Sequence, residues 1–231
     1  MEQRTTATRA MKWNALSPSS RVSSSQSTVG GHHEVETGAV ALLSLAASGK
    51  RVEEAKALIW RSRVDVNDTL KDGSGLTALH LACQADNSGL VALLLANSDI
   101  DVNAKAAQNC TPFMAACTSN ALSTVRWLLR DSRVNINTPE ASGRTPFRAA
   151  AVKGHLGVIK MILASGREVN ADIPDDDLAN PAETASDQGV VARLMAEFKK
   201  DKAATRGALQ VELGMQSTFF TLSPQVEAHS L

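Results

Sequence analysis

The sequence contains very few aromatic residues, and this scarcity limits the kind of core that it can build. Tyrosine is absent, and aromatic residues make up 3% of the 231 positions, whereas 43% are hydrophobic. Alanine, leucine and valine therefore supply most of the apolar surface available for burial. Small aliphatic side chains of this kind favour thin layers of closely packed helices over a thick sandwich of sheets.

The chain also lacks an excess of charge of one sign and any long apolar run. Its 24 lysines and arginines balance 24 aspartates and glutamates, so no global positive field favours nucleic acid. No run approaches the roughly 18 consecutive apolar residues of a membrane-spanning helix, and the first residues lack the apolar segment of a secretory signal. We therefore expect no nucleic-acid partner, no membrane and a cytoplasmic location. The nucleus is an alternative, and mitochondrial targeting by the basic, Ser-rich N-terminus is a less favoured one.

Cysteine is scarce too, and its spacing predicts neither a disulfide framework nor a metal site. Cys83, Cys110 and Cys117 form no even set and no Cys-x-x-Cys pair, and His80 is the only histidine near them. Because Cys83 and Cys117 lie in apolar segments, we expect both to be buried thiols. Neighbouring packed helices lie about 8 to 10 Å apart, whereas a disulfide needs Cα atoms within roughly 7 Å, so no bridge is expected.

Sequence motifs of catalysis are missing as well. There is no Gly-x-Ser-x-Gly elbow, no Gly-rich phosphate loop with lysine and no paired metal motif. The triplets at residues 32–34 (His-His-Glu) and 175–177 (Asp-Asp-Asp) lack the ligand spacing of zinc and calcium sites, and we interpret them as tail and turn. We expect no catalytic residue, no metal and no cofactor, and an enzyme with an unrecognised site is the alternative.

What the chain does contain is a repeat. The segment Thr-Ala-Leu-His-Leu-Ala begins at Thr77, and related segments begin at Thr111 and Thr145. The interval from Thr77 to Thr111 equals that from Thr111 to Thr145, and we call it the repeat interval. A second marker, a short apolar segment that ends in asparagine, recurs at Asn67, Asn103, Asn137 and Asn170. Two independent markers with closely similar spacing predict a chain built of repeated structural units.

Each unit is predicted to hold two helices. Threonine can cap the free amides of a first turn and proline is tolerated directly after it, so each Thr of the first marker opens a short helix. Apolar residues at i, i+3 and i+4 then predict a longer second helix near residues 90–95, 125–129 and 158–163. Leu94 and Leu128 are expected in the core. Trp60 and Trp127 are interpreted as packed between layers, with partial exposure as the alternative for Trp60 because it lies in the terminal unit.

The repeated unit resembles that of the ankyrin-repeat family, which is about 33 residues long and carries Thr-Pro-Leu-His-x-Ala at its first helix. The unit from Gly143 through Asn170 is the fullest match. In other respects the units depart from the pattern: Ala78 replaces the proline in one unit, and Met114 and Arg148 replace the histidine in two others. The resemblance implies an all-α fold. We expect an ankyrin-repeat solenoid of about five helix-turn-helix repeats, two of them degenerate caps, with flexible termini.

The predicted domain organisation follows the extent of this resemblance. Residues 1–37 are predicted to be a disordered Ser- and Arg-containing tail, because their composition cannot form a core. Residues 38–200 are predicted to form the ankyrin-repeat domain, and residues 201–231 a C-terminal helix and tail. The helix itself is expected over residues 201–213.

Function is expected to reside on the surface that the repeats leave free. The resemblance implies that the concave face and the turns of the solenoid bind a partner protein, and that the chain is a monomeric protein-protein interaction module. The residues expected to contact the partner are Lys71, Leu76, Gln84, Lys105, Gln108, Thr118, Arg144, Val152 and Lys153. The alternative is a scaffold or regulatory adaptor whose N-terminal tail is the active element.

Overall fold

The computed structural model describes residues 41–46, 52–61, 64–173 and 187–215. These residues form helices and turns with one isolated β-bridge, between Thr69 and Thr77. Residues 41–46 are helical, and the later elements are α2 (Val52–Arg61), α3 (Ala78–Gln84), α4 (Ser88–Leu95), the 3-10 turn η1 (Ala107–Asn109), α5 (Pro112–Thr118), α6 (Leu122–Arg130), α7 (Pro146–Val152), α8 (Leu156–Ala164), α10 (Asp187–Lys200) and α11 (Lys202–Glu212). The predicted all-α architecture is confirmed.

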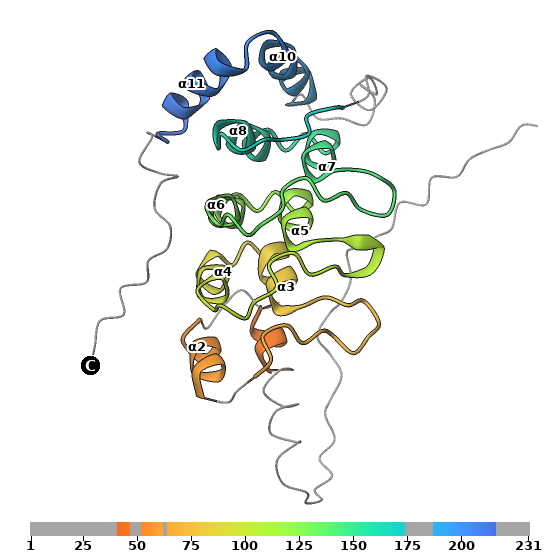
Figure 1. Ribbon diagram of the computed structural model, residues 1–231, viewed down its shortest axis with the longest axis vertical. Helices are drawn as coiled ribbons and strands as arrows, with labels where there is room; N and C mark the ends of the chain where they lie inside the picture. The colour runs from red at the N-terminus through yellow and green to blue at the C-terminus, as the bar shows by residue number, and fades with distance from the viewer. Residues whose placement is uncertain (1–40, 47–51, 62–63, 174–186, 216–231) are drawn as a thin grey trace, which may run out of the picture.

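The helices stack in two columns. Figure 1 shows the short first helices α3, α5 and α7 one above another, beside a column of second helices formed by α2, α4, α6 and α8. Within each column every helix packs on the next, and each first helix packs on the second helix that follows it. The predicted solenoid is therefore present. The beginning of the degenerate last unit, residues 174–186, lies outside the described residues.

Each first helix begins where its threonine predicts. Thr77, Thr111 and Thr145 are the N-caps of α3, α5 and α7, and each side-chain oxygen accepts a hydrogen bond from the main-chain N–H three residues later. All three threonines are buried, so these bonds satisfy amides that water cannot reach. The repeat therefore places one buried cap at the start of every complete unit.

A ladder of asparagine side chains joins consecutive units on the turns that follow the second helices. The Asn103 amide nitrogen donates to the Arg133 carbonyl at 2.8 Å, while its oxygen accepts from the Asn135 N–H at 2.7 Å. Asn67 and Asn137 make the equivalent pair of bonds to the units that follow them. One side chain thus satisfies both a donor and an acceptor of its neighbour's main chain, which fixes the spacing between units.

The core follows the predicted register, with one exception. Leu94 and Leu128 on the second helices are 0% exposed, and Phe113 and Phe147 on the first helices are also buried. Trp127, however, is 38% exposed on α6, so the interpretation that it packs between layers is wrong. Its indole lies on the solvent side of the second-helix column, where the Arg130 guanidinium stands 5.6 Å from the ring centroid. The side chain of Trp60 lies outside the described residues.

The C-terminal segment adds a further helix to the stack. Helix α11 begins after Asp201, whose carboxylate accepts the Ala203 and Ala204 N–H groups as an N-cap, and it packs against α8 and α10. A helix is thus present in the segment where residues 201–213 predict one. The boundaries of the N-terminal and C-terminal tails, residues 1–37 and 214–231, lie almost wholly outside the described residues and stay predictions.

The three cysteines are free thiols. Cys83 and Cys117 are buried and Cys110 is half-buried, and burial raises the pKa of the Cys110 thiol to about 11. Among the described helices, none combines the length and the apolar character that crossing a bilayer requires.

The burial of Leu128 makes a quantitative prediction. Leu128→Ala should lower the free energy of unfolding by about 2 to 5 kcal/mol, because it removes a fully buried side chain from between packed helices. Leu94→Ala should behave alike. Val211→Ala is the matched control, since Val211 is 82% exposed and its truncation should stay within about 0.5 kcal/mol. Denaturant unfolding followed by circular dichroism measures the difference, and wild-type stability of both leucine variants would contradict this register.

Candidate protein-binding surface

Three hairpin-like loops precede the first helices and project away from the second-helix column (Figure 1). Each loop is closed at its base by a main-chain hydrogen bond: Leu70 N to Leu76 O at 2.9 Å, Ala106 N to Cys110 O at 2.9 Å and Glu140 N to Arg144 O at 3.0 Å. Bonds between loops follow, from Ala107 N to Ser74 O at 2.8 Å and from Ala141 N to Gln108 O at 2.7 Å. The loops are therefore held at fixed positions relative to one another.

The loops turn at residues with left-handed backbone conformation. Gly75, Asn109 and Gly143 have φ values of +69°, +58° and +81°, and each is separated from the next by the repeat interval. Glycine adopts this conformation without strain and asparagine tolerates it. The repeat therefore reproduces the loop shape as well as the helices.

The nine residues expected to contact a partner fall into two groups. Lys71, Lys105 and Gln108 are exposed in the loops, with Leu76 half-buried and Arg144 half-buried just before the cap of α7. The second group lies at the C-terminal ends of the first helices: Gln84, Thr118 and Val152 are the last residues of α3, α5 and α7, and Lys153 follows as the C-cap of α7. The two groups occupy opposite ends of the first helices, so the nine do not form a single row.

A contact within the second group joins the third and fourth units. The Lys153 Nζ donates to the Thr118 carbonyl at 2.8 Å, and the His155 Nε2 approaches the same oxygen at 3.2 Å. Arg144 Nε lies 3.8 Å from Glu140 Oε1. Lys153 and His155 thereby occupy the carbonyl that ends α5, which joins the surfaces of two successive units.

The charges of this cluster act on one another. Burial lowers the pKa of Lys153, and the positive charge of Arg144 lowers it further, while Glu140 acts in the opposite direction. Two cations are thus held close enough to repel each other, with one carboxylate as partial compensation. A carboxylate supplied by a bound molecule would relieve this repulsion.

His80 links two units below this surface. It is buried, its Nδ1 accepts from the Thr77 N–H at 3.2 Å, and its Nε2 lies 2.9 Å from the Cys110 carbonyl of the next loop. With Nδ1 as the acceptor, the proton resides on Nε2 and donates to Cys110. His80 therefore links the cap of α3 to the loop of the next unit and fixes the position of that loop.

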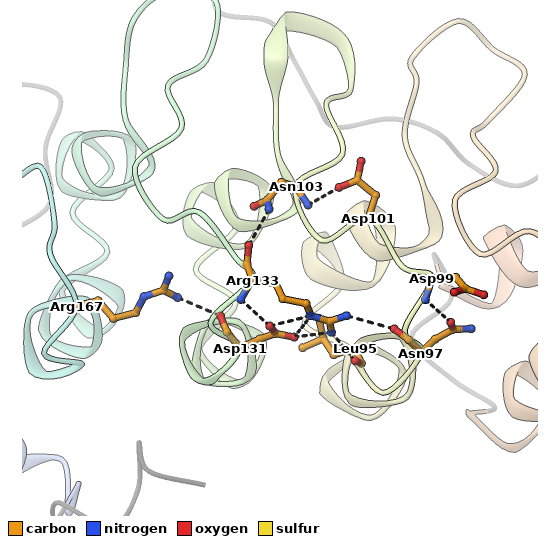
Figure 2. A network of polar contacts seen from close by, with 8 residues as sticks. All are labelled: Leu95, Asn97, Asp99, Asp101, Asn103, Asp131, Arg133 and Arg167. Carbon is orange, nitrogen blue, oxygen red and sulfur yellow. Dashed lines mark hydrogen bonds and ion pairs between the residues drawn. The ribbon is translucent and has the colours of Figure 1, made fainter. Parts of the chain in front are cut away.

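A charged network that the sequence alone did not reveal ties together the ends of the second helices (Figure 2). The Arg133 Nη2 donates to the Leu95 carbonyl at 2.7 Å, where α4 ends, and its Nε donates to the Asp131 carboxylate at 3.1 Å. Arg167 repeats the arrangement one unit later, with Nη1 donating to the Asp131 carbonyl at 3.2 Å. Arg133 thus caps α4, and Arg167 binds the turn that directly follows α6.

The carboxylate in this network stays ionised despite its position. Burial opposes the ionisation of Asp131, but the hydrogen bonds and charge of Arg133, together with the charge of Arg167, outweigh it and lower the pKa of Asp131. The signal in the sequence was the spacing, since the repeat interval also separates Arg133 from Arg167. In the unit before them the equivalent position is Asp99, which interrupts the pattern.

The described residues hold no cluster of three or more histidine, cysteine, aspartate or glutamate side chains placed to bind a metal ion. The His-His-Glu triplet at residues 32–34 and the aspartates at 175–177 lie outside those residues. What the surface offers chemically is hydrogen-bonding and charged groups on a fixed scaffold.

The buried His80 predicts a pH dependence of stability. Burial lowers the pKa of His80 below its ordinary value of 6.5. As the pH falls, His80 therefore binds a proton in the unfolded chain at a higher pH than in the folded chain. Stability is then full above about pH 6.5 and falls as the pH drops toward the folded pKa. His80→Met, which supplies the side chain that α5 has at Met114, should make this loss shallower. It should also cost about 1 to 3 kcal/mol at pH 7.5, because the Thr77 N–H loses its partner.

Urea unfolding between pH 7.5 and 5 measures both effects of His80→Met. The matched control is His155→Gln, which removes a half-buried histidine whose pKa is also lowered by burial. His155→Gln should also weaken the dependence of the free energy of unfolding on pH, but it should not cause the large loss of stability at pH 7.5. An unchanged slope in His80→Met would show that His80 does not titrate as its burial indicates.

Comparison with known families agrees with the geometry. A family model described as ankyrin repeats (3 copies) matches residues 29–106 and again residues 106–175, which together make up more than half of the chain. No curated protein shows a significant match to the sequence. Ankyrin repeats are generally protein-protein interaction modules and are typically not enzymes. With three complete units, their threonine caps and this match, the chain belongs to the ankyrin-repeat family.

Proposed function

We propose that this chain binds a partner protein through the loops and the exposed side of α3, α5 and α7, which form the concave face of the solenoid. The observation that carries the proposal is the cluster of polar groups at the third and fourth units, in which the Lys153 Nζ at the end of α7 reaches the Thr118 carbonyl at the end of α5, and Arg144 precedes the N-cap of α7. Their positions are fixed by the Lys153–Thr118 hydrogen bond and by the interlocked loops. A prearranged surface loses little side-chain freedom on binding.

The composition of this surface suits a protein partner. It presents lysine, arginine, glutamine and threonine together with the half-buried aliphatic groups of Leu76 and Val152. The described residues of the loops and first helices expose no aromatic ring on which a nucleic-acid base could stack. Mixed polar groups around small apolar ones are typical of protein-protein interfaces.

The partner is proposed to bring at least one carboxylate to the cluster. The positive charge of Arg144 acts on Lys153, so an incoming carboxylate would be attracted by both cations. Charge complementarity of this kind raises the association rate and makes it depend on salt. The affinity should therefore fall as ionic strength rises.

The test is a quadruple variant of the full chain that replaces Gln84, Thr118, Arg144 and Lys153 with alanine. If the cluster contains the centre of the interface, affinity for the partner should fall at least about tenfold, because a few central residues supply most of the binding energy. Helix content and unfolding temperature should hardly change, since surface substitutions typically cost no more than about 0.5 kcal/mol each.

The matched control replaces Glu197 and Lys199, both exposed on α10, and should bind as the wild type does. The partner is first obtained by affinity capture with the intact chain, and each variant is then titrated against it by calorimetry. Equal affinity of the quadruple variant and the wild type would remove the support for this face and shift the interaction to another surface or to the N-terminal tail.

A further inference from the structure

The outer face of α8 is covered by the C-terminal helix. Met161 on this face is 4% exposed. Around it, the Lys160 Nζ lies 2.5 Å from the Glu212 carboxylate, and the Gln210 Nε2 donates to the Ala164 carbonyl at 2.9 Å. The second-helix column is therefore not solvent-exposed at this unit, because α11 lies across it.

The equivalent face of α6 carries a large side chain that the described residues leave exposed. Trp127 precedes Met161 by the repeat interval and so occupies the same position in its unit, yet it is 38% exposed. Beside it, Arg130 stands over the indole ring at 5.6 Å. One position is thus buried in one unit and open in the unit next to it.

The chain that continues beyond α11 is suited to this open face. Phenylalanine occurs five times in the sequence, and Phe113, Phe147 and Phe198 are buried in the stack. The other two are adjacent, Phe219 and Phe220, shortly after the end of α11. Aromatic rings gain from packing against one another in addition to the burial of their surface, so a Phe-Phe pair and an exposed tryptophan are complementary partners.

The connection is short enough. Neighbouring helices of the column are about 8 to 10 Å apart, and an extended chain spans up to about 3.6 Å per residue. Met215, the last described residue, is buried, and Figure 1 shows α11 ending beside the second-helix column near α8. Four residues from Met215 to Phe219 thus reach up to about 14 Å, enough to pass from the face of α8 to that of α6.

We propose that residues 216–222, with Phe219 and Phe220 as anchors, dock on the outer face of α6 against Trp127 and Arg130. This segment continues the cover that α11 provides for α8 and closes the solvent-exposed side of the column at the next unit. The inference concerns the face opposite the proposed partner surface and does not depend on it. The contact is intramolecular, so it should not depend on protein concentration.

The test measures the exposure of Trp127 in the full chain. With Trp13→Phe and Trp60→Phe in the background, Trp127 is the only fluorophore of its kind, since the sequence holds three tryptophans. Phe219→Ser together with Phe220→Ser should increase acrylamide quenching of Trp127 and shift its emission to longer wavelength. The control, Val211→Ser, removes an exposed apolar side chain from α11 and should leave quenching unchanged.

A second measurement avoids the background substitutions. In the otherwise unchanged chain, the indole N–H signal of Trp127, assigned with Trp127→Phe, should shift in the Phe219→Ser/Phe220→Ser variant and keep its position in Val211→Ser. Equal quenching and an unmoved signal in the double variant would overturn the proposal. Shielding that disappears on dilution would overturn it as well, because it would identify a second copy of the chain as the occupant.

Discussion

The stack depends on one bifunctional contact, the asparagine side chain that joins each inter-unit turn to the next. An amide group both donates and accepts, so a single residue can satisfy a carbonyl and an N–H of the neighbouring main chain at once. Asn67, Asn103 and Asn137 each do so. Turns at the edge of a helical stack are open to water, and these contacts hold successive turns in register.

This contact works together with two others that connect units at different depths. His80 reaches from α3 to the loop of the next unit in the buried layer, and Arg133 reaches back to the end of α4 on the opposite side. Each bond crosses from one unit to its neighbour and none extends farther. The stability of such a chain is approximately the sum of the stabilities of its units and of the interfaces between neighbouring units. Because each unit depends only on its neighbours, α3, α5 and α7 keep the same shape although Ala78, Met114 and Arg148 depart from the family pattern.

Local signals with a short range made most of the fold predictable. A threonine cap and the apolar residues of a second helix act within one unit, so the sequence around Thr111 and Leu128 was sufficient to place them. The exposure of Trp127 was not predictable in this way, because it depends on whether another segment covers α6. The role of Arg133 was not predictable for a similar reason, since it depends on the end of the preceding helix lying beside the guanidinium. On the candidate surface, the sequence identified Thr118 and Lys153 as surface residues, but their direct contact is a product of the stacking.

The most direct test of the asparagine ladder is native-state hydrogen exchange at the main-chain N–H groups of Asp101, Asn135 and Asn170. These residues are exposed, yet each N–H donates to a ladder side chain, at 2.8, 2.7 and 2.8 Å respectively. If the ladder couples the units, all three amides should exchange slowly, with protection close to that of the second helices, because they open only when neighbouring units separate. Exchange as fast as in the exposed loop at Lys105 would contradict the account, since the asparagine side chains would then not couple the units.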